Sequence, residues 1–357
     1  MDTALYHENG VEVTTHSMLK SFGRCPKHAQ YKYWERLKKR IMNERDRPLH
    51  RGTWMHLLLQ EHYMGRDWRV MHRRLSSQFA ELFDEEKEAL GDLPTECARL
   101  MRSYLWHYGA DKSDRFHGWK VKAVELKLEC PWPDDRNRIY RCRLDLMVED
   151  RYGLWIVDHK THKNLPDIWF RLLDFQSALY IWCAWQNGFP VRGFIWNYVR
   201  TKAPTTPSLA YAGTPRERLS IAEIDTDYVT YYLGVKALGR LNDPVAQAKL
   251  RYLKDQRWAP DAIQTSPFFR REILEKDDDM IARVVGSAMR TRDRMHAYHW
   301  DTLDDVERVV DRSCGWCDFN QLCTTELFGG NAKAIRRDYR VGNPMDYYED
   351  TKDLSLV

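Results

Sequence analysis

Two stretches of alternating apolar and polar residues, 139–149 and 154–160, flank a four-residue turn that ends in Gly153. Such alternation is typical of β-strands, and a turn this short joins neighbouring antiparallel strands. If the turn pairs Glu149 with Leu154, Asp145 lies directly opposite Asp158. We therefore predict a β-hairpin that carries two facing carboxylates.

Strict alternation also predicts how the first strand divides its side chains between the two faces of the sheet. Asp145 should share its face with Arg141, Arg143 and Met147. The other face should carry four apolar side chains: Cys142, Leu144, Leu146 and Val148.

The pattern around this hairpin alternates between helical and strand periodicity. We expect further strands at 121–129 and 191–199, and helices at 17–37, 52–63, 81–108 (interrupted near Gly91 and Pro94), 168–186, 228–253 and 276–299. Strands flanked by long helices indicate an α/β or α+β fold with a central mixed sheet. The 357 residues, 43% of them hydrophobic, suffice for one large core, and they contain no repeat or flexible linker. We expect a single domain spanning 1–357.

The facing carboxylates indicate a metal site. Two opposed acids repel each other and raise the pKa of one of them, whereas a bound divalent cation removes the repulsion. Oxygen ligands without thiolates suit Mg²⁺ or Mn²⁺. Lys160 lies on the same strand face as Asp158, where it could stabilise a developing negative charge. The alternative is a pair of exposed acids near a turn, with Lys160 as their surface ion-pair partner.

Four other residues are candidates for the same site. Glu125 lies on the preceding strand, and His56 follows Gly52 by one helical turn. Gln176 and Tyr180 are four residues apart and therefore share a helical face. Each also has a simpler interpretation, because a histidine in an aromatic helix is often a packed core residue, and Gln and Tyr often lie at the surface or cap a helix.

Taken in order, these residues resemble the PD-(D/E)XK nuclease superfamily. The pattern is Gly52-xxx-His56, Glu125, Asp145, Asp158-x-Lys160 and Gln176-xxx-Tyr180. It is most similar to the RecB-like exonuclease branch, which includes phage and CRISPR-associated exonucleases, and the resemblance extends over 17–323.

The resemblance implies a restriction-endonuclease-like core, in which 17–63 is a helical segment and 121–200 forms the catalytic sheet and helix. It also implies a role for each matching residue. Lys160 would be the catalytic lysine, and Gln176 and Tyr180 would lie beside the substrate strand. The metal ligands would be His56, Asp145, Asp158 and the carbonyl of His159.

A second metal site is indicated near the end of the chain, within 310–325. Cys314-x₂-Cys317-x₅-Cys323 has metal-ligand spacing, and Cys25, which precedes Pro26, is the natural fourth ligand. Four cysteines serve zinc or an iron–sulfur cluster equally well. The resemblance to iron–sulfur RecB-like nucleases implies a [4Fe–4S] cluster that ties the two ends of the domain together. The other cysteines are isolated along the chain and read as small buried hydrophobic residues: Cys97, Cys130, Cys142 and Cys183.

Basic residues are clustered although the net charge is only +4. The range 36–51 contains seven Lys or Arg against two acids, and a second group surrounds Arg292. Together with nearby aromatic residues they could bind the phosphates and bases of DNA. Solvated helix faces are the alternative for each cluster.

These observations predict a metal-dependent exodeoxyribonuclease that processes DNA ends in phage recombination or replication. One alternative is a CRISPR-associated nuclease that trims spacer precursors, and either enzyme could act with a recombination or CRISPR partner protein. Another alternative is a non-catalytic, zinc-containing DNA-binding protein. With no signal sequence, no membrane span and few cysteines, we expect a cytoplasmic protein.

Overall fold

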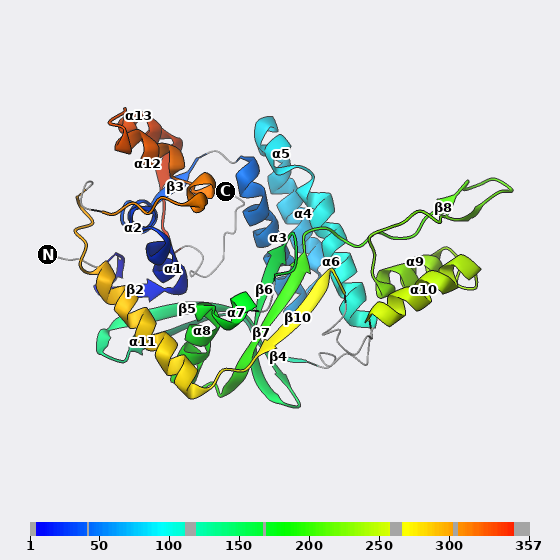
Figure 1. Cartoon of the computed structure of the whole chain (residues 1–357), viewed down its shortest axis with the longest axis horizontal. Coiled ribbons are helices and arrows are strands. Elements are labelled where there is room, and N and C mark those ends of the chain that lie inside the picture. The colour runs from blue at the N-terminus through cyan, green and yellow to red at the C-terminus, as the bar shows by residue number, and fades with distance from the viewer. Residues whose placement is uncertain are drawn as a thin grey trace.

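The computed structural model describes residues 5–40, 43–110, 119–166, 169–257, 266–302 and 306–345. Its centre is a seven-stranded sheet in the order β1-β2-β5-β6-β7-β10, with β4 paired to β5 (Figure 1). The strands are β1 (His7–Glu8), β2 (Val11–Thr15), β4 (Lys120–Trp132), β5 (Asp135–Asp150), β6 (Gly153–His162), β7 (Val191–Arg200) and β10 (Phe269–Leu274). The pairs β2–β5 and β6–β7 are parallel and the others are antiparallel, so the predicted mixed sheet is confirmed.

Helices cover both faces of this sheet. α1 (His16–Arg24), α8 (Phe175–Gln186) and α11 (Asp278–Met295) enclose the larger hydrophobic core. α3 (Arg47–Tyr63), α4 (Trp68–Ala80) and α6 (Leu93–Ala110) enclose a second core that includes Val199 and Phe269. α3 contacts β4, β5 and β6, whereas α8 contacts β4, β5 and β7. The site described below lies where these two helical layers meet the sheet.

The predicted hairpin has the expected register but not the expected faces. Glu149 pairs with Leu154, and extending this register by one position beyond Leu146–Val157 sets Asp145 against Asp158. However, Leu144 and Met147 both lie in the larger core, while Leu146 packs in a separate cluster with Val148, Trp155, Val157 and Ile195. The prediction of strict alternation is therefore wrong at Asp145. Glu125, on the paired strand, adopts a left-handed backbone with φ 54°, a local irregularity that re-aims side chains as a β-bulge does.

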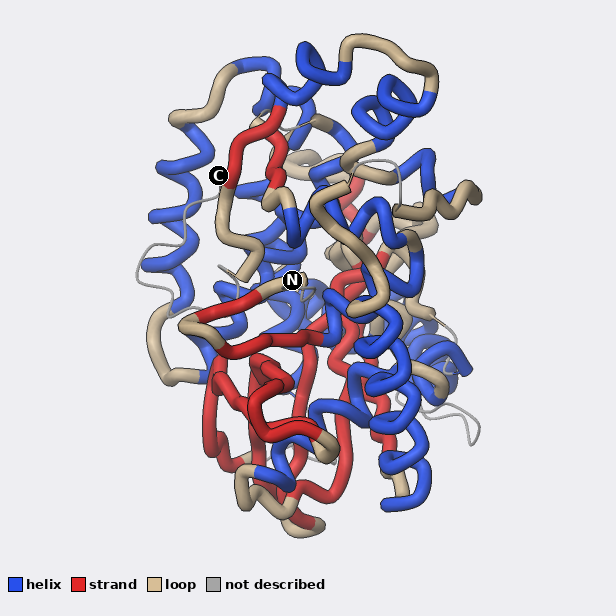
Figure 2. Tube along the Cα trace, turned by 90° about the vertical axis from the view of Figure 1, so that its left-hand side faces the viewer, coloured by secondary structure: helices blue, strands red, loops and turns tan. Residues whose placement is uncertain are grey.

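The N-terminal helix predicted over 17–37 is also divided. Pro26 restricts Cys25 to an extended conformation, which ends α1, and α2 (Pro26–Ala29) follows, then a short π-helix (Gln30–Trp34). Arg36, with φ 56°, turns the chain into β3 (Leu37–Lys39). This strand pairs with β11 (Tyr339–Val341), and Figure 2 shows the small ribbon apart from the main sheet. The two ends of the domain are thus joined by backbone hydrogen bonds.

Other helices differ from the predicted ranges in detail. The helix expected at 168–186, whose first residue lies outside the described ranges, is interrupted at Leu173, because Asp174 caps α8 by accepting a hydrogen bond from the Gln176 N–H at 2.8 Å. The range 228–253 forms two helices, since Gly239 with φ 68° follows the first. β10 was not predicted.

The remaining elements are α5 (Asp84–Leu90), α7 (Trp169–Leu172), α9 (Tyr228–Ala237), α10 (Pro244–Arg257), α12 (Asn320–Leu327), α13 (Ala332–Ile335), three 3₁₀ turns (Glu44–Asp46, Arg312–Trp316, Arg336–Asp338) and a projecting ribbon of β8 (Leu209–Ala210) and β9 (Arg218–Leu219).

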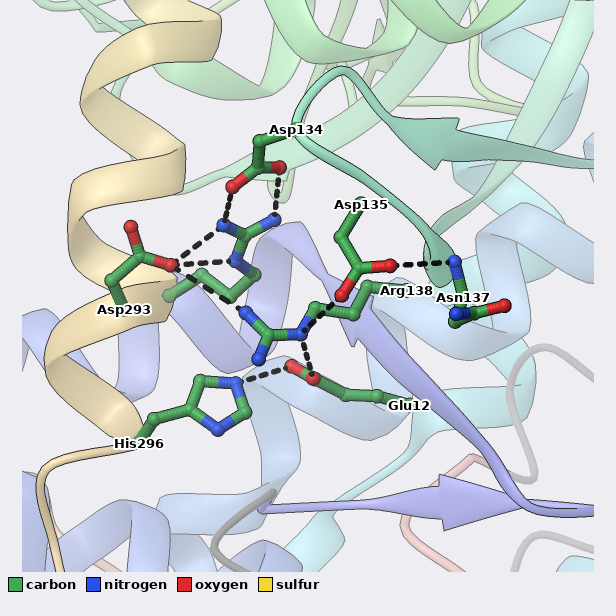
Figure 3. A network of polar contacts seen from close by, with 8 residues as sticks. Glu12, Asp134, Asp135, Asn137, Arg138, Asp293 and His296 are labelled. Carbon is green, nitrogen blue, oxygen red and sulfur yellow. Dashed lines mark hydrogen bonds and ion pairs between the residues drawn. The ribbon is translucent and has the colours of Figure 1, made fainter.

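A network of ion pairs anchors α11 to the edge of the sheet (Figure 3). Arg292 is fully buried and pairs with Asp134 in the β4–β5 turn. Glu12 on β2 pairs with Arg138 at 3.1 Å and with His296 at 2.8 Å. The sequence analysis grouped Arg292 with residues that could bind phosphate. Its burial and its pairing with Asp134 show that it connects α11 to the sheet instead. In the described part of the chain, no helix is both long and apolar enough to cross a membrane.

Candidate active site

Three side chains from different elements bring potential metal ligands together. His56 comes from α3, Glu125 from β4 and Asp145 from β5, and their ligand atoms all lie within 4.8 Å of one another. His56 Nδ1 is 3.3 Å from Asp145 Oδ2, and Asp145 is only 3% exposed. One imidazole and two carboxylates are a donor set that suits Mn²⁺ or Mg²⁺.

Asp145 is held in its ionised form. Burial alone would raise the pKa of its carboxyl group, but the adjacent His56, His159 and Lys160 lower the pKa below its usual value. The backbone N–H of His159 also donates a hydrogen bond to Asp145 Oδ2 at 2.8 Å. The Asp145 carboxylate is therefore available as an anionic donor in this group.

Asp158 and Lys160 lie on β6, the strand next to Asp145, and their side chains contact each other on one face of that strand, as predicted. Lys160 Nζ is 2.6 Å from Asp158 Oδ2, and the side-chain amide of Gln176 donates to Asp158 Oδ1 at 2.6 Å. Burial raises the pKa of Asp158 to about 6 although Lys160 opposes this shift. Burial would lower the pKa of Lys160, but Asp158 and Asp145 raise it, so the ammonium group stays protonated at neutral pH.

Glu125 is the carboxylate whose charge is least favoured. Burial and the nearby charge of Asp145 raise its pKa to about 8, although its partner Arg143, at 2.7 Å, lowers it. A cation in the triad would supply the positive charge that a second carboxylate requires here. The sequence pointed to Glu125 only through its place on a strand, since the irregular backbone has no clear signature.

The ring of His159 lies beside the triad, 5.9 Å from the ring of His56, and it lines the groove. Its Nδ1 is 2.6 Å from the Asn197 amide nitrogen, and its ring stacks on Tyr63 at 5.6 Å. Asn197 donates onward to Tyr104, which also accepts a hydrogen bond from the buried Arg271. This polar network supports the strand behind Asp145, and the sequence analysis missed it. Asn197, a lone amide in an apolar strand, was the available signal.

Gln176 and Tyr180 have different positions although they share a helix. Gln176 reaches Asp158 and lines the open groove above the site. Tyr180 is 5% exposed and lies in the larger core, with its ring 6.2 Å from that of Phe194. Tyr180 therefore stands behind the site and not among the residues that line the groove.

The groove has a volume of about 590 Å³, and its lining is rich in cationic side chains. Besides His56, Glu125 and Lys160 it contains Gly52, which lies on α3 one turn before His56. The other charged and imidazole side chains that line it are the cationic Lys20, Arg143 and Arg171 and the histidines His16, His159 and His162. Arg171 stacks over Trp196 at 4.4 Å and donates to the Tyr198 hydroxyl at 2.7 Å. Carboxylates below cationic walls match a phosphodiester that is bound together with a metal ion. Sequence reasoning did not identify Lys20 or Arg171, because neither belongs to the motifs that carry the other candidates.

The predicted cysteine set lies around a separate cavity of about 190 Å³. All four cysteines line it, although Cys25 and the other three come from opposite ends of the chain: Cys25, Cys314, Cys317 and Cys323. Arg24, Lys27 and Arg308 add positive charge to the lining. The four remaining cysteines are buried, as expected: Cys97, Cys130, Cys142 and Cys183.

The basic segment predicted to contact DNA near the N-terminus is engaged in structural contacts. Lys38 and Lys39 belong to β3, and Lys39 also pairs with Asp46 and Asp318 at 3.5 and 3.2 Å. Arg40 donates to the carbonyl of Tyr339. The described residues of this segment that line the groove are Pro48 and Leu49, neither of which is basic.

Comparison with known proteins agrees with the geometry. The sequence model of the PD-(D/E)XK nuclease superfamily matches residues 14–324, so the chain belongs to this superfamily. Its members are nucleases, and they use divalent metal ions such as Mg²⁺ to hydrolyse nucleic acid. No curated protein matches the chain. Among solved structures, one described as "Crystal structure of SSO0001" is 12% identical, with a match that covers 71% of this chain and 88% of that one and a TM-score of 0.23.

Proposed function

We propose that this nuclease is a metal-dependent DNA exonuclease of the RecB-like branch. The observation that supports this most directly is the close grouping of His56, Glu125 and Asp145 near the Asp158–Lys160 pair. Of these residues, His56, Glu125 and Lys160 line a groove that also contains Lys20, Arg143 and Arg171. A non-catalytic DNA-binding protein has no physical reason to keep three acids together at the point of closest phosphate approach. Processing of DNA ends in phage recombination or replication fits this activity, and trimming of CRISPR spacers is the alternative.

The proposed metal ligands are His56, Asp145, Asp158 and the carbonyl of His159, to which the geometry adds Glu125. A divalent cation bound there would lower the pKa of a water molecule and neutralise charge on the scissile phosphate. Gln176 fixes the orientation of Asp158 through its hydrogen bond. These donors fit a divalent cation. One imidazole and two carboxylates lie close together, and a cation would supply the positive charge that offsets the two carboxylates.

Lys160 carries the protein's own contribution to the chemistry. Its ammonium group, protonated at neutral pH, lines the groove next to the carboxylates. From there it can donate hydrogen bonds to a phosphate oxygen and stabilise the charge that develops during attack. Lys20 and Arg171, farther along the groove, would hold neighbouring phosphates and keep the strand in place.

A [4Fe–4S] cluster held by Cys25, Cys314, Cys317 and Cys323 completes the proposal. All four cysteines line one cavity of about 190 Å³. Four thiolates serve zinc or an iron–sulfur cluster, and the resemblance to iron–sulfur RecB-like nucleases favours the cluster. Cationic neighbours would compensate the negative charge of four thiolates. The cluster would add a covalent link to the β3–β11 pairing between the two ends of the domain.

The experiment that tests the nuclease activity uses end-labelled linear DNA, single- and double-stranded, with and without Mg²⁺ or Mn²⁺. We expect degradation only with metal, and none by Lys160→Ala protein. Lys163→Ala is the matched control, since Lys163 is an exposed lysine three residues away that does not line the groove. Degradation by folded Lys160→Ala protein at the wild-type rate would refute the active-site assignment.

A further inference from the structure

A second cavity, of about 300 Å³, adjoins the end of the catalytic groove. The two share His16 and Lys20 of α1 as a common wall. At the start of α8 the consecutive residues Gln176 and Phe175 line the groove and the second cavity, respectively. A strand that lies in the groove can therefore place one of its substituents in the second cavity without leaving the site.

The second cavity combines an apolar wall with four polar residues, His16, Lys20, Asp174 and Thr291. Leu19, Leu179 and Ala288 form its apolar wall, with contributions from three helices, α1, α8 and α11. Phe175 lies at its edge with 39% of its surface exposed. An exposed aromatic ring beside an apolar wall is a surface on which a planar base can stack. The volume is at the lower end of the range of roughly 300–1,000 Å³ that is typical of small-molecule sites.

His16 gives the cavity a polar group with unused hydrogen-bonding capacity. Its Nδ1 atom is buried and has no hydrogen-bond partner among the described residues, while its Nε2 is 4.0 Å from Asp174 Oδ1. Burial lowers the pKa of His16 to about 4, although Asp174 opposes this shift, so the ring is neutral at pH 7. His16 therefore contributes an uncharged ring to the wall that the groove and the second cavity share.

The positive charges lie on the groove side of this wall. Lys20 stands at the junction, and Arg171 is tied to the same α8 N-terminus through Asp174 at 3.0 Å. Phosphates would thus follow the groove while apolar material enters the side cavity. This division of charged and apolar surface matches the backbone and base of one nucleotide.

We propose that the second cavity receives the unpaired base of a nucleotide adjoining the scissile phosphate. The proposal rests on the nuclease function proposed above and specifies its substrate as a single-stranded DNA end. A base within a duplex is stacked and paired, so it cannot enter a side cavity without being pulled out of the helix. The cavity then explains how the enzyme holds a strand in one register during cleavage.

Gly23 offers a substitution that fills the cavity. It lines the cavity on α1, and an added Cβ at this position meets no atom within 4 Å. Gly23→Leu should therefore fold normally and occupy the space of the base. Gly109→Leu is the matched control, because Gly109 is also an exposed helical glycine with open space around it and lies in α6, whose residues line neither cavity. Phe175→Ala, which removes the stacking ring, is a second independent variant.

The experiment measures binding and cleavage of single-stranded oligonucleotides in which one abasic nucleotide is moved through the terminal positions. Binding is followed by fluorescence anisotropy without metal, and cleavage by initial rates with Mn²⁺. Stacking of a base is worth about 1–3 kcal/mol, so at one position the abasic substitution should weaken wild-type binding about tenfold. The ratio of the Kd for the abasic oligonucleotide to the Kd for the intact one should fall towards one in Gly23→Leu and Phe175→Ala. In Gly109→Leu this ratio should stay at the wild-type value.

The two readouts separate this proposal from the nuclease function. Cleavage of every substrate without preference for a base at any position would refute the base cavity and leave the nuclease intact. Binding that depends on the base and is lost in Gly23→Leu, in a protein that cleaves nothing, would keep the cavity and refute the nuclease. Gly23→Leu protein with the full wild-type preference would also overturn the base cavity.

Discussion

Glu326 joins the two ends of the domain, and its replacement by Gln should loosen them. Its carboxylate accepts a hydrogen bond from Tyr31 and pairs with Arg336 at 2.7 Å. It also lies 3.5 Å from both Lys27 Nζ and an Arg308 guanidinium nitrogen. Tyr31 and Lys27 come from the N-terminal region, whereas Arg308, Arg336 and Glu326 come from the C-terminal one.

The size of the effect follows from the burial of these partners. The side chain of Lys27 is completely buried and that of Glu326 is 10% exposed. Removing one partner of a buried ion pair leaves the other charge uncompensated, which destabilises by about 3–5 kcal/mol. Gln keeps the shape and the contact with Tyr31, and Arg336 is partly exposed, so we expect a loss near the lower limit, about 3 kcal/mol.

Hydrogen exchange of the β3–β11 amides measures this loss where it occurs. A loss of about 3 kcal/mol corresponds to roughly 100-fold faster exchange if the ribbon opens as one unit. Glu275→Gln is the matched control, because Glu275 forms an exposed pair with Arg192 and is remote from the ribbon. Unchanged β3–β11 protection in Glu326→Gln would refute the idea that this carboxylate holds the two ends together.

The same carboxylate predicts the direction of a pH effect. Burial would raise the pKa of Glu326, but its hydrogen bonds with Tyr31 and Arg336, and the charge of Lys27, lower it below 4.5. A depressed folded-state pKa contributes stability that is fully present above the unfolded value and is lost as the pH falls. Protection of the ribbon should therefore decline below about pH 4.5 in the wild type, and this decline should be weaker in Glu326→Gln.

Three further results are expected. Asp158→Asn should abolish DNA degradation while the protein stays folded, and a folded variant that degrades DNA at the wild-type rate would contradict the site. Anaerobically purified protein should be brown with about four irons per chain, and Cys317→Ser should lose the iron while Cys183→Ser keeps it. A colourless wild-type protein that contains one zinc per chain would exclude the cluster. Covalently closed single-stranded circles should resist degradation under conditions that consume linear strands, and rapid cutting of circles would indicate an endonuclease.

Much of the sheet could be predicted because local patterns determine it. The short turn that ends in Gly153 fixes the register of β5 and β6, and extending this register by one position sets Asp145 opposite Asp158. The order of His56, Glu125 and Lys160 along the chain then indicated a candidate site. The fold followed from the same patterns, since alternating strands next to long helices have few ways to bury their apolar faces.

The features that escaped prediction depend on contacts between distant segments. The left-handed backbone at Glu125 is tolerated because β4 is fixed on both sides of it by its pairing with β5, and no single residue type announces it. The pairing of β3 with β11 joins strands of three residues each, too short to show a period. Arg171 illustrates the consequence for function, because its sequence neighbours suggest only a helix end, while Trp196 and Tyr198 on β7 hold it over the groove. Residues that carry out chemistry can be recognised from type and order, whereas residues that bind and position the strand are defined by the surfaces that three-dimensional packing brings together.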